Sequence, residues 1–215
     1  MKKNYYPIAI LLFAVTITLS ACSTSRMQKS QEVQSTMQSV DNDIKLIIVQ
    51  LDAIGASLDE LTKPGQADVK KALNVYSDNV SKIEKMEKTF SKDADKMDKS
   101  GKAYFESWHK EKNQYDNSEI QQRSDERRAA LGKIYDRIAQ NNVGVKEAFR
   151  IYVSDVNEIN SFISNDLTSK GISSIASLSD KTVENGRQLK SALSDLQSAI
   201  EDARAEMTQS GISIN

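Results

Sequence analysis

The segment that decides the fold runs from Tyr104 to Tyr135 and reads YFESWHKEKNQYDNSEIQQRSDERRAALGKIY. Apolar residues on both sides of it recur at helical spacing, whereas the run 116–118 in its middle is a polar Asp-Asn-Ser turn. A short connection between two long helices forces them to run antiparallel. The segment therefore predicts a central helical hairpin, with the rest of the chain leading into it and out of it.

Four stretches of the chain carry helical periodicity, and we expect helices over about 28–62, 66–114, 118–168 and 172–208. In the first, apolar residues from Val33 to Leu61 alternate steps of four and three, which is the 3.5-residue spacing of supercoiled helices. No strand pattern competes with this periodicity. The sequence predicts an all-α fold, an elongated antiparallel four-helix bundle or coiled coil with a projecting central helical hairpin.

Turn residues separate the four predicted helices. Pro64-Gly65 ends the first, and Gly171 is predicted as a glycine stop for the third. The fourth helix carries one irregular stretch over 182–186, an eleven-residue stutter that locally unwinds a supercoil. The tail 209–215 is short and polar and is expected to fray.

Helix lengths predict which residues face each other. Folding at the turns pairs residues whose numbers sum to about 129 between the first and second helices, about 232 between the second and third, and about 340 between the third and fourth. Gly101 is then expected opposite Leu131, and both outer helices are expected to stop at nearly the same height. About 14 residues of each central arm would project beyond them, or roughly 20 Å.

The N-terminal residues 1–21 are predicted to be a lipoprotein signal peptide. Lys2 and Lys3 precede an apolar stretch, and Leu-Ser-Ala then leads directly into Cys22. We expect cleavage before Cys22 and acyl chains on its thiol and amine, so that residues 22–27 form a lipidated linker to the membrane. Ser23 favours an outer-membrane location facing the periplasm of a bacterial envelope. The alternative is an ordinary signal peptide with a chance cysteine.

The hairpin tip gathers aromatic and basic residues on the side of the bundle where Cys22 is expected. A membrane interface favours aromatic rings and basic side chains. One hypothesis is that the tip rests on the membrane or contacts a membrane-bound partner. The alternative is that the aromatic rings hold the two arms together while arginines stack on them. The candidate contact residues are Tyr104, Phe105, Trp108, Lys110, Lys112, Tyr115, Arg123, Arg127 and Arg128.

The sequence offers little for catalysis, and we expect no enzyme, no cofactor, no metal and no catalytic residue. His109 is the sole histidine, Cys22 is expected to be acylated, and glycine-rich phosphate loops are missing. The formal net charge is −1, and about −3 once the signal peptide leaves, which does not suggest nucleic acid. A lysine ladder over 85–99 could follow an anionic polymer, but interleaved acidic residues are expected to cancel most of its field.

The motifs of the central hairpin resemble a family of bacterial coiled-coil proteins defined by a domain of unknown function. The similar motifs are Phe105-Glu-Ser-Trp108, Tyr115-Asp-Asn117, Arg123-Ser124, Arg128 and Tyr135, followed by the stretches 165–167 and 172–175. The resemblance covers roughly residues 35–208. It implies a helical shape and no activity. Some relatives carry the label DNA repair ATPase, which does not suit a chain with an export signal and no nucleotide loop.

Three functional hypotheses follow. The first is a membrane-anchored envelope lipoprotein that acts as a structural or protein-interaction scaffold. The second is a carrier or lipid-handling module that holds an apolar ligand within the bundle. Glycines inside the helices, at 55, 101, 144 and 186, mark either loosened places for such a ligand or close helix packing. The third is an adaptor, or a self-associating protein, that uses an apolar stripe with Leu46 and Val49.

Overall fold

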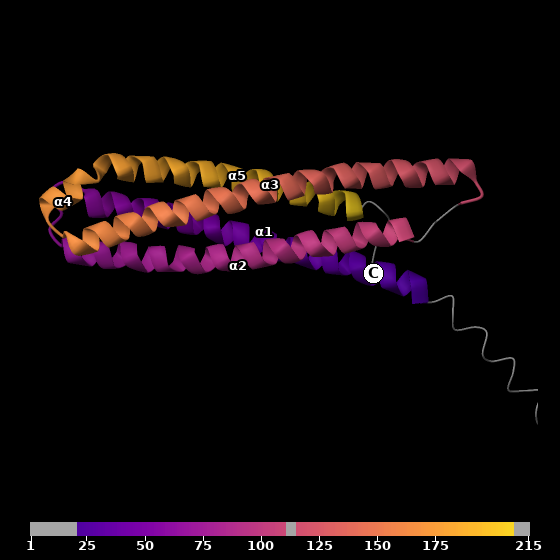
Figure 1. The fold of residues 1–215 in the computed structure, drawn as a ribbon, viewed down its shortest axis with the longest axis horizontal. Coiled ribbons are helices and arrows are strands. Elements are labelled where there is room, and N and C mark those ends of the chain that lie inside the picture. Colours follow the sequence, from indigo (N-terminus) through magenta and orange to yellow (C-terminus); the bar gives the residue numbers. More distant parts are fainter. Residues whose placement is uncertain (1–20, 111–114, 209–215) are drawn as a thin grey trace, which may run out of the picture.

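The computed structural model describes residues 21–110 and 115–208, and the side chains of residues 27–107 and 115–208. It contains helices α1 (Ala21–Thr62), α2 (Val69–Lys110), α3 (Ser118–Asn165), α4 (Ser169–Ser174) and α5 (Ala176–Thr208). The four long helices run antiparallel along one axis in Figure 1. Over the described residues there is no strand. The predicted all-α, elongated four-helix bundle is confirmed.

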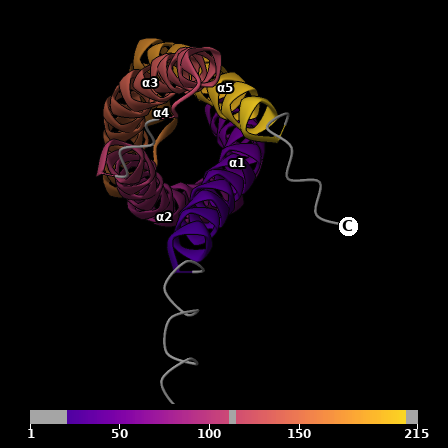
Figure 2. The ribbon, with the colours of Figure 1, turned by 90° about the vertical axis from the view of Figure 1, so that its right-hand side faces the viewer.

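The four long helices close around a common axis. Helix α1 packs on α2, α2 on α3, α3 on α5, and α5 returns to α1. The end-on view in Figure 2 shows this closed arrangement. Each helix therefore has two neighbours, and the stripe of apolar residues along it is covered from both sides.

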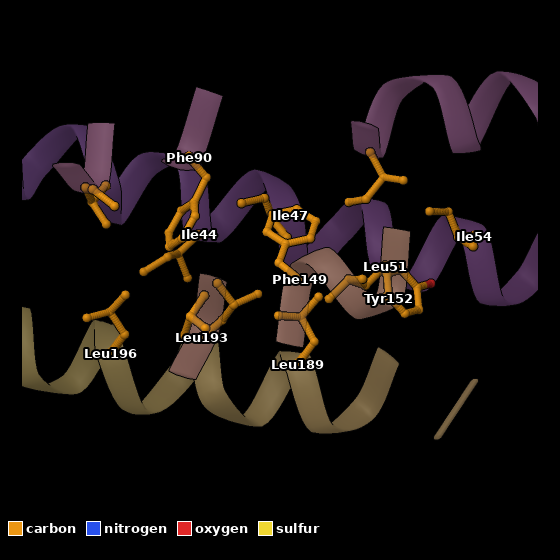
Figure 3. Packing of buried hydrophobic residues seen from close by; sticks show 14 of the residues in the cluster. Ile44, Ile47, Leu51, Ile54, Phe90, Phe149, Tyr152, Leu189, Leu193 and Leu196 are labelled. Atoms are coloured by element: carbon orange, nitrogen blue, oxygen red, sulfur yellow. The ribbon is translucent and has the colours of Figure 1, made fainter. Parts of the chain in front are cut away.

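Large apolar side chains fill the centre of the bundle along its length. Figure 3 shows Ile44 and Ile47 of α1, Phe90 of α2, Phe149 of α3 and Leu193 of α5 gathered between the helices. All five are fully buried, and the rings of Phe90 and Phe149 lie 6.1 Å apart. Burial of one such side chain contributes about 1.5–3 kcal/mol. The apolar repeat predicted from the sequence is the core of the fold.

The predicted pairing of α3 with α5 matches the structure, whereas the pairing of α1 with α2 matches at Gln50 and departs from the prediction at Thr36. Gln50 Nε2 donates to Asn79 Oδ1 at 3.1 Å between α1 and α2. Asn185 Nδ2 donates to Asp155 Oδ2 at 2.7 Å between α5 and α3. The two residue numbers add up to the predicted value in each pair. The last connection therefore sets the relative height of α3 and α5 as the sequence indicates, whereas Thr36 of α1 contacts Ser100 of α2, seven residues beyond its predicted partner.

Helices α2 and α3 are shifted by about one turn from the predicted pairing. Gly101 faces Tyr135 and not Leu131, which is buried in the core. The shift is possible because Gly101 has no side chain, so the Tyr135 ring can lie against the backbone of α2. The expectation that Gly101 lies opposite Leu131 is wrong by four residues.

The N-terminal helix is longer than predicted. Helix α1 begins at Ala21, so the stretch 22–27, expected as a linker, is helical. The Thr36 hydroxyl bonds the Ser100 hydroxyl at 2.8 Å, which sets the height of α1 beside α2. From Thr36 the helix continues for about 22 Å to its first residue. The expectation that both outer helices stop at the same height is therefore wrong. Helix α5 stops first, and α3 extends beyond it on the right of Figure 1.

The fourth predicted helix is divided in two. The Thr168 hydroxyl accepts a hydrogen bond from Gly171 N–H at 3.0 Å and thereby starts α4 three residues earlier than predicted. Helix α4 ends at Ser174, and α5 starts after Ile175. Gly171 is therefore not the stop signal that its position suggests. It lies inside α4, where a Cβ would meet the Asp166 carbonyl oxygen at 2.5 Å.

The other predicted helix boundaries differ by a few residues. Helix α2 covers Val69–Lys110 where 66–114 was expected, and α3 ends at Asn165 where 168 was expected. Residues 111–114 and the tail 209–215 lie outside the described residues. Gly65 does form the predicted reversal, with a φ of 73° that suits glycine.

Two of the four glycines singled out in the helices sit in close packing. A Cβ on Gly101 would meet the Tyr135 ring, and one on Gly186 would lie 3.0 Å from the Tyr152 ring. Gly55 and Gly144 have no neighbour within 4 Å of that position. Close packing therefore explains Gly101 and Gly186, whereas Gly55 and Gly144 face open space.

Candidate functional site

Aromatic rings join the two arms of the central hairpin. Phe105 of α2 meets Tyr135 of α3 edge to face, with ring centroids 4.7 Å apart and planes at 83°. Tyr104 packs against Phe105 with centroids 5.6 Å apart. Such edge-to-face pairs add about 0.5–1.5 kcal/mol beyond their buried area. This contact corresponds to the alternative in which the aromatic residues of the tip hold the arms together.

A cleft of about 600 Å³ lies between α2 and α3 beside these rings. Several of its lining residues are small, and they leave room that larger side chains would fill. Gly132 contributes to this room, since nothing lies within 4 Å of where its Cβ would be. The residues that form its apolar lining are Gly101, Phe105, Ala129, Gly132, Tyr135 and Ala139.

Charged residues line the rim of this cleft. Lys102 Nζ donates to Asp98 Oδ2 at 2.7 Å on the α2 side, and Arg128 pairs with Asp125 on the α3 side. The hydrogen bond to Asp98 raises the pKa of Lys102, so this lysine stays charged at neutral pH. A rim of this kind, with an apolar lining, suits the binding of an amphipathic group or of a partner's side chains.

Tyr135 is held in place by contacts with three residues. Its hydroxyl donates to Met207 Sδ of α5 at 3.8 Å, while its ring contacts Gly101 and Phe105. Burial raises the pKa of Tyr135, and the nearby Tyr104 adds to this shift. The phenol therefore stays neutral at physiological pH. Tyr135 connects α2, α3 and α5 at the height where α5 ends.

The described residues of the predicted tip differ in their exposure. Tyr104 is buried, Phe105 is half-buried, and Tyr115 is exposed. Trp108 and Lys110 belong to the last turn of α2, but their side chains lie outside the described residues, as does all of Lys112.

The arginines of the tip have different surroundings. Arg123 pairs with Glu119 at 2.7 Å one turn earlier in α3. Arg128 pairs with Asp125 at the rim of the cleft. The Nε of Arg127 is buried without a hydrogen-bond partner. Among the tip residues whose side chains the structure describes, Phe105 and Arg128 line the cleft.

Sequence reasoning missed the small residues that open the cleft. Ala129, Gly132 and Ala139 share one face of α3, and this spacing was a signal that could have been read. This spacing does not show which residues of α2 face the small residues of α3, because that depends on how the two helices are shifted along each other. The rim pairs Lys102–Asp98 and Arg128–Asp125 look like ordinary surface charges at helical spacing.

Neither a membrane-spanning helix nor a group of metal-binding side chains occurs among the described residues. Within residues 21–110 and 115–208, none of the helices carries an apolar stretch long enough to cross a bilayer. The described residues contain no group of three or more histidine, cysteine or acidic residues placed to hold a metal ion. The side chains of Cys22 and His109 lie outside the description.

The apolar stripe predicted on α1 is exposed. Leu46 and Val49 have 60% and 68% of their surface open to solvent, on the side of α1 away from the core. Val143 of α3 is similarly exposed, at 70%. The bundle thus leaves uncovered the two residues that the adaptor and self-association hypotheses need.

Comparison with known proteins adds no relative. The chain matches no protein-family model, no curated protein and no solved structure. The resemblance to the coiled-coil family therefore stays a prediction. What the molecule does has to be argued from its own geometry.

Proposed function

We propose that the protein is a membrane-anchored envelope lipoprotein that acts as a structural or protein-interaction scaffold. The observation that supports this proposal best is the filled core of a long closed bundle. Fully buried Tyr76, Phe90 and Phe149 belong to this core, as in a rigid rod. Such a rod suits a spacer or docking element, and Leu-Ser-Ala before Cys22 provides the anchor.

The end of the bundle that carries the cleft would lie near the lipid. Helix α1 runs without a break from Ala21 into the core, where Val33 is the first fully buried residue. From Cys22 to Val33 the helix rises about 16 Å. An acylated Cys22 would thus hold the hairpin end close to the membrane, with the rest of the rod extending away from it.

Anchoring can be tested with a Cys22→Ser variant and a radiolabelled fatty acid. We expect the parent protein to incorporate the label and to stay with the outer-membrane fraction, whereas the variant incorporates none and is released. A Ser23→Ala variant, which keeps the cysteine, serves as the control. Equal membrane retention of Cys22→Ser without label would contradict the proposed anchor.

Docking at the cleft can be tested by site-specific photocrosslinking in cells. A photoreactive amino acid replaces Ala129, which lines the cleft, or the neighbouring Ala130, which is also exposed but does not line it. We expect a crosslink to a distinct envelope protein from position 129 and none from position 130. Identical products from both positions would show that the cleft is not the docking site.

A second candidate is the carrier, favoured by the size and apolar lining of the cleft. In contrast to the sequence-based hypothesis, the ligand would lie between α2 and α3 at the surface and not within the bundle. A fluorescent fatty acid should bind the protein and be lost in Ala129→Trp, while Ala130→Trp keeps binding. If both variants bind it equally, the carrier role fails and the scaffold proposal is unaffected.

A further inference from the structure

The outer face of α2 carries a row of lysines that the scaffold role does not use. The lysine ridge comprises Lys82, Lys85, Lys88, Lys92, Lys96 and Lys99. All are exposed, and steps of three and four place them on one side of the helix. The ridge runs parallel to the helix axis for about 26 Å.

Three of the acidic residues that alternate with these lysines in sequence are turned to the α3 flank: Glu84, Asp95 and Asp98. Glu84 Oε1 accepts a hydrogen bond from Asn157 Nδ2 at 2.6 Å, and Asp95 pairs with Lys146, both on α3. Asp98 faces the cleft and pairs with Lys102. These carboxylates are therefore held by partners outside the ridge.

The opposite flank faces α1. Asp93 is half-buried there and lies near Asp43 of α1, while its own contact is with Lys96 at 3.1 Å. Glu87 is half-buried where it interrupts the apolar repeat. Within the part of the chain that the structure describes, the ridge lysines other than Lys96 form no ion pair. The expected cancellation of the ladder by its acidic neighbours is thus incomplete.

The ridge borders a shallow hollow. It measures about 580 Å³ and is lined by Lys88, Ser91, Lys92, Asp95 and Lys99, together with Glu87 and Lys96. A chain lying in this hollow would pass several ammonium groups in succession. Lysine ammonium groups are flexible point charges, so they recognise the spacing of negative charges and not a fixed planar shape.

We propose that the lysine ridge binds a linear phosphate polymer laid along α2. Successive lysines rise by about 4.5–6 Å, which is compatible with a chain that carries a charge at every unit. The ridge is one lysine wide, with carboxylates on both flanks. A flat anionic membrane would meet the carboxylates of both flanks, whereas a narrow polymer in the hollow meets four ridge lysines and only two carboxylates, of which Asp95 is paired with Lys146. The proposal is independent of the lipid anchor and of the cleft.

Binding can be measured by fluorescence anisotropy with labelled long-chain inorganic polyphosphate and the full lipidated protein in a non-ionic detergent. The test variant is the triple Lys88→Gln, Lys92→Gln, Lys99→Gln. The control is the triple Lys133→Gln, Lys170→Gln, Lys181→Gln, which removes the same charge from exposed lysines elsewhere. Circular dichroism and thermal unfolding establish that both triples keep the fold.

We expect the test triple to lose at least about tenfold in affinity and to lower the slope of log affinity against log salt by about two. The control triple should bind as the parent does. Equal losses in both triples would show that binding depends on net charge alone, which would overturn the proposal. Absence of binding by the parent protein would overturn it as well. Ridge-dependent binding to phosphatidylglycerol vesicles, or tighter binding to single-stranded DNA than to polyphosphate, would assign the ridge to a membrane or to nucleic acid instead.

Discussion

The ring of Tyr135 lies directly on the backbone of Gly101, so that a Cβ on Gly101 would come within 2.6 Å of Cε1. This contact joins α2 to α3 at the height where α5 ends and Met207 meets the Tyr135 hydroxyl. Phe105 meets the same ring edge to face, so that two residues of α2 hold Tyr135. The packing of α2 on α3 at this height depends on this contact.

A Gly101→Ala substitution should destabilise the bundle although alanine is the better helix former. The added methyl group would displace a ring that is held by Phe105 and Met207, and such overpacking costs about 1–3 kcal/mol. We expect a net loss of about 1–2 kcal/mol in the free energy of unfolding, measured by urea denaturation. Gly132→Ala is the control, because its Cβ would meet nothing and helix propensity alone should stabilise by up to about 1 kcal/mol. A gain from both substitutions would contradict the close contact.

An Asp43→Asn substitution should stabilise the protein at neutral pH. Burial raises the pKa of Asp43, and the nearby Asp93 raises it further. One of its oxygens is buried without a partner. The charged form is therefore unfavourable in the fold, and this penalty develops as pH rises from the unfolded pKa through the raised folded pKa. We expect a gain of about 0.5 kcal/mol at pH 7 that disappears below about pH 4. Exposed Asp59→Asn, measured by thermal unfolding across pH, should show no such gain.

An Asp41→Asn substitution should have the opposite effect. Burial acts to raise the pKa of this carboxyl, but hydrogen bonds from Lys45 and Gln197 outweigh it, so the pKa is lowered. Both bonds are 2.7 Å long, and Gln197 comes from α5. The stabilisation is present above the unfolded pKa and is lost as pH falls through the lowered folded pKa. We expect Asn to reduce stability at pH 7 by about 1–3 kcal/mol in urea denaturation. An unchanged midpoint would show that the bond from Gln197 does not stabilise the contact of α1 with α5.

A Tyr76→Phe substitution should weaken the contact between α2 and α3. The Tyr76 hydroxyl is buried and donates to the Val156 carbonyl oxygen at 3.0 Å. Loss of this bond should lower the free energy of unfolding by about 1 kcal/mol. Exposed Tyr115→Phe should change it little. Burial raises the pKa of Tyr76, so alkaline titration of the folded protein should leave this phenol un-ionised when exposed tyrosines have titrated.

Replacing Leu46 and Val49 with serine tests the exposed stripe on α1. Because both side chains point to solvent, the free energy of unfolding should change by less than about 0.5 kcal/mol. If the stripe joins copies of the chain, sedimentation equilibrium should show weaker self-association in the double variant. Val143→Ser, equally exposed on α3, is the control. Unchanged association would assign the stripe to another partner or to none.

Much of this architecture could be read from the chain alone. The 3.5-residue repeat from Val33 onward predicts the buried face of α1, and the same residues form the core. Pro64-Gly65 and the turn at 116–118 predict where the chain reverses. Because short turns leave little slack, they also predict which residues of α3 and α5 lie at the same height, and they do so for α1 and α2 at Gln50 but not at Thr36. Periodicity and turn chemistry are local properties, so a sequence displays them directly.

The cleft and the lysine ridge could not be predicted from the sequence in this way, because they depend on which helices become neighbours. The shift that places Tyr135 on Gly101 reflects how one ring fits one gap, and the cleft beside Gly132 follows from that fit. Likewise, Asp95 pairs with Lys146 of α3 and not with a lysine of the ridge, because Lys146 lies within reach. From the sequence alone, Asp95 looks like a partner for its own helix. The repeat of apolar residues in the sequence thus determined the bundle. Contacts between helices decided the register of the hairpin, the cleft and the charge of the α2 surface. The reason is that packing and ion pairing depend on which side chains are neighbours, and only folding brings these neighbours together.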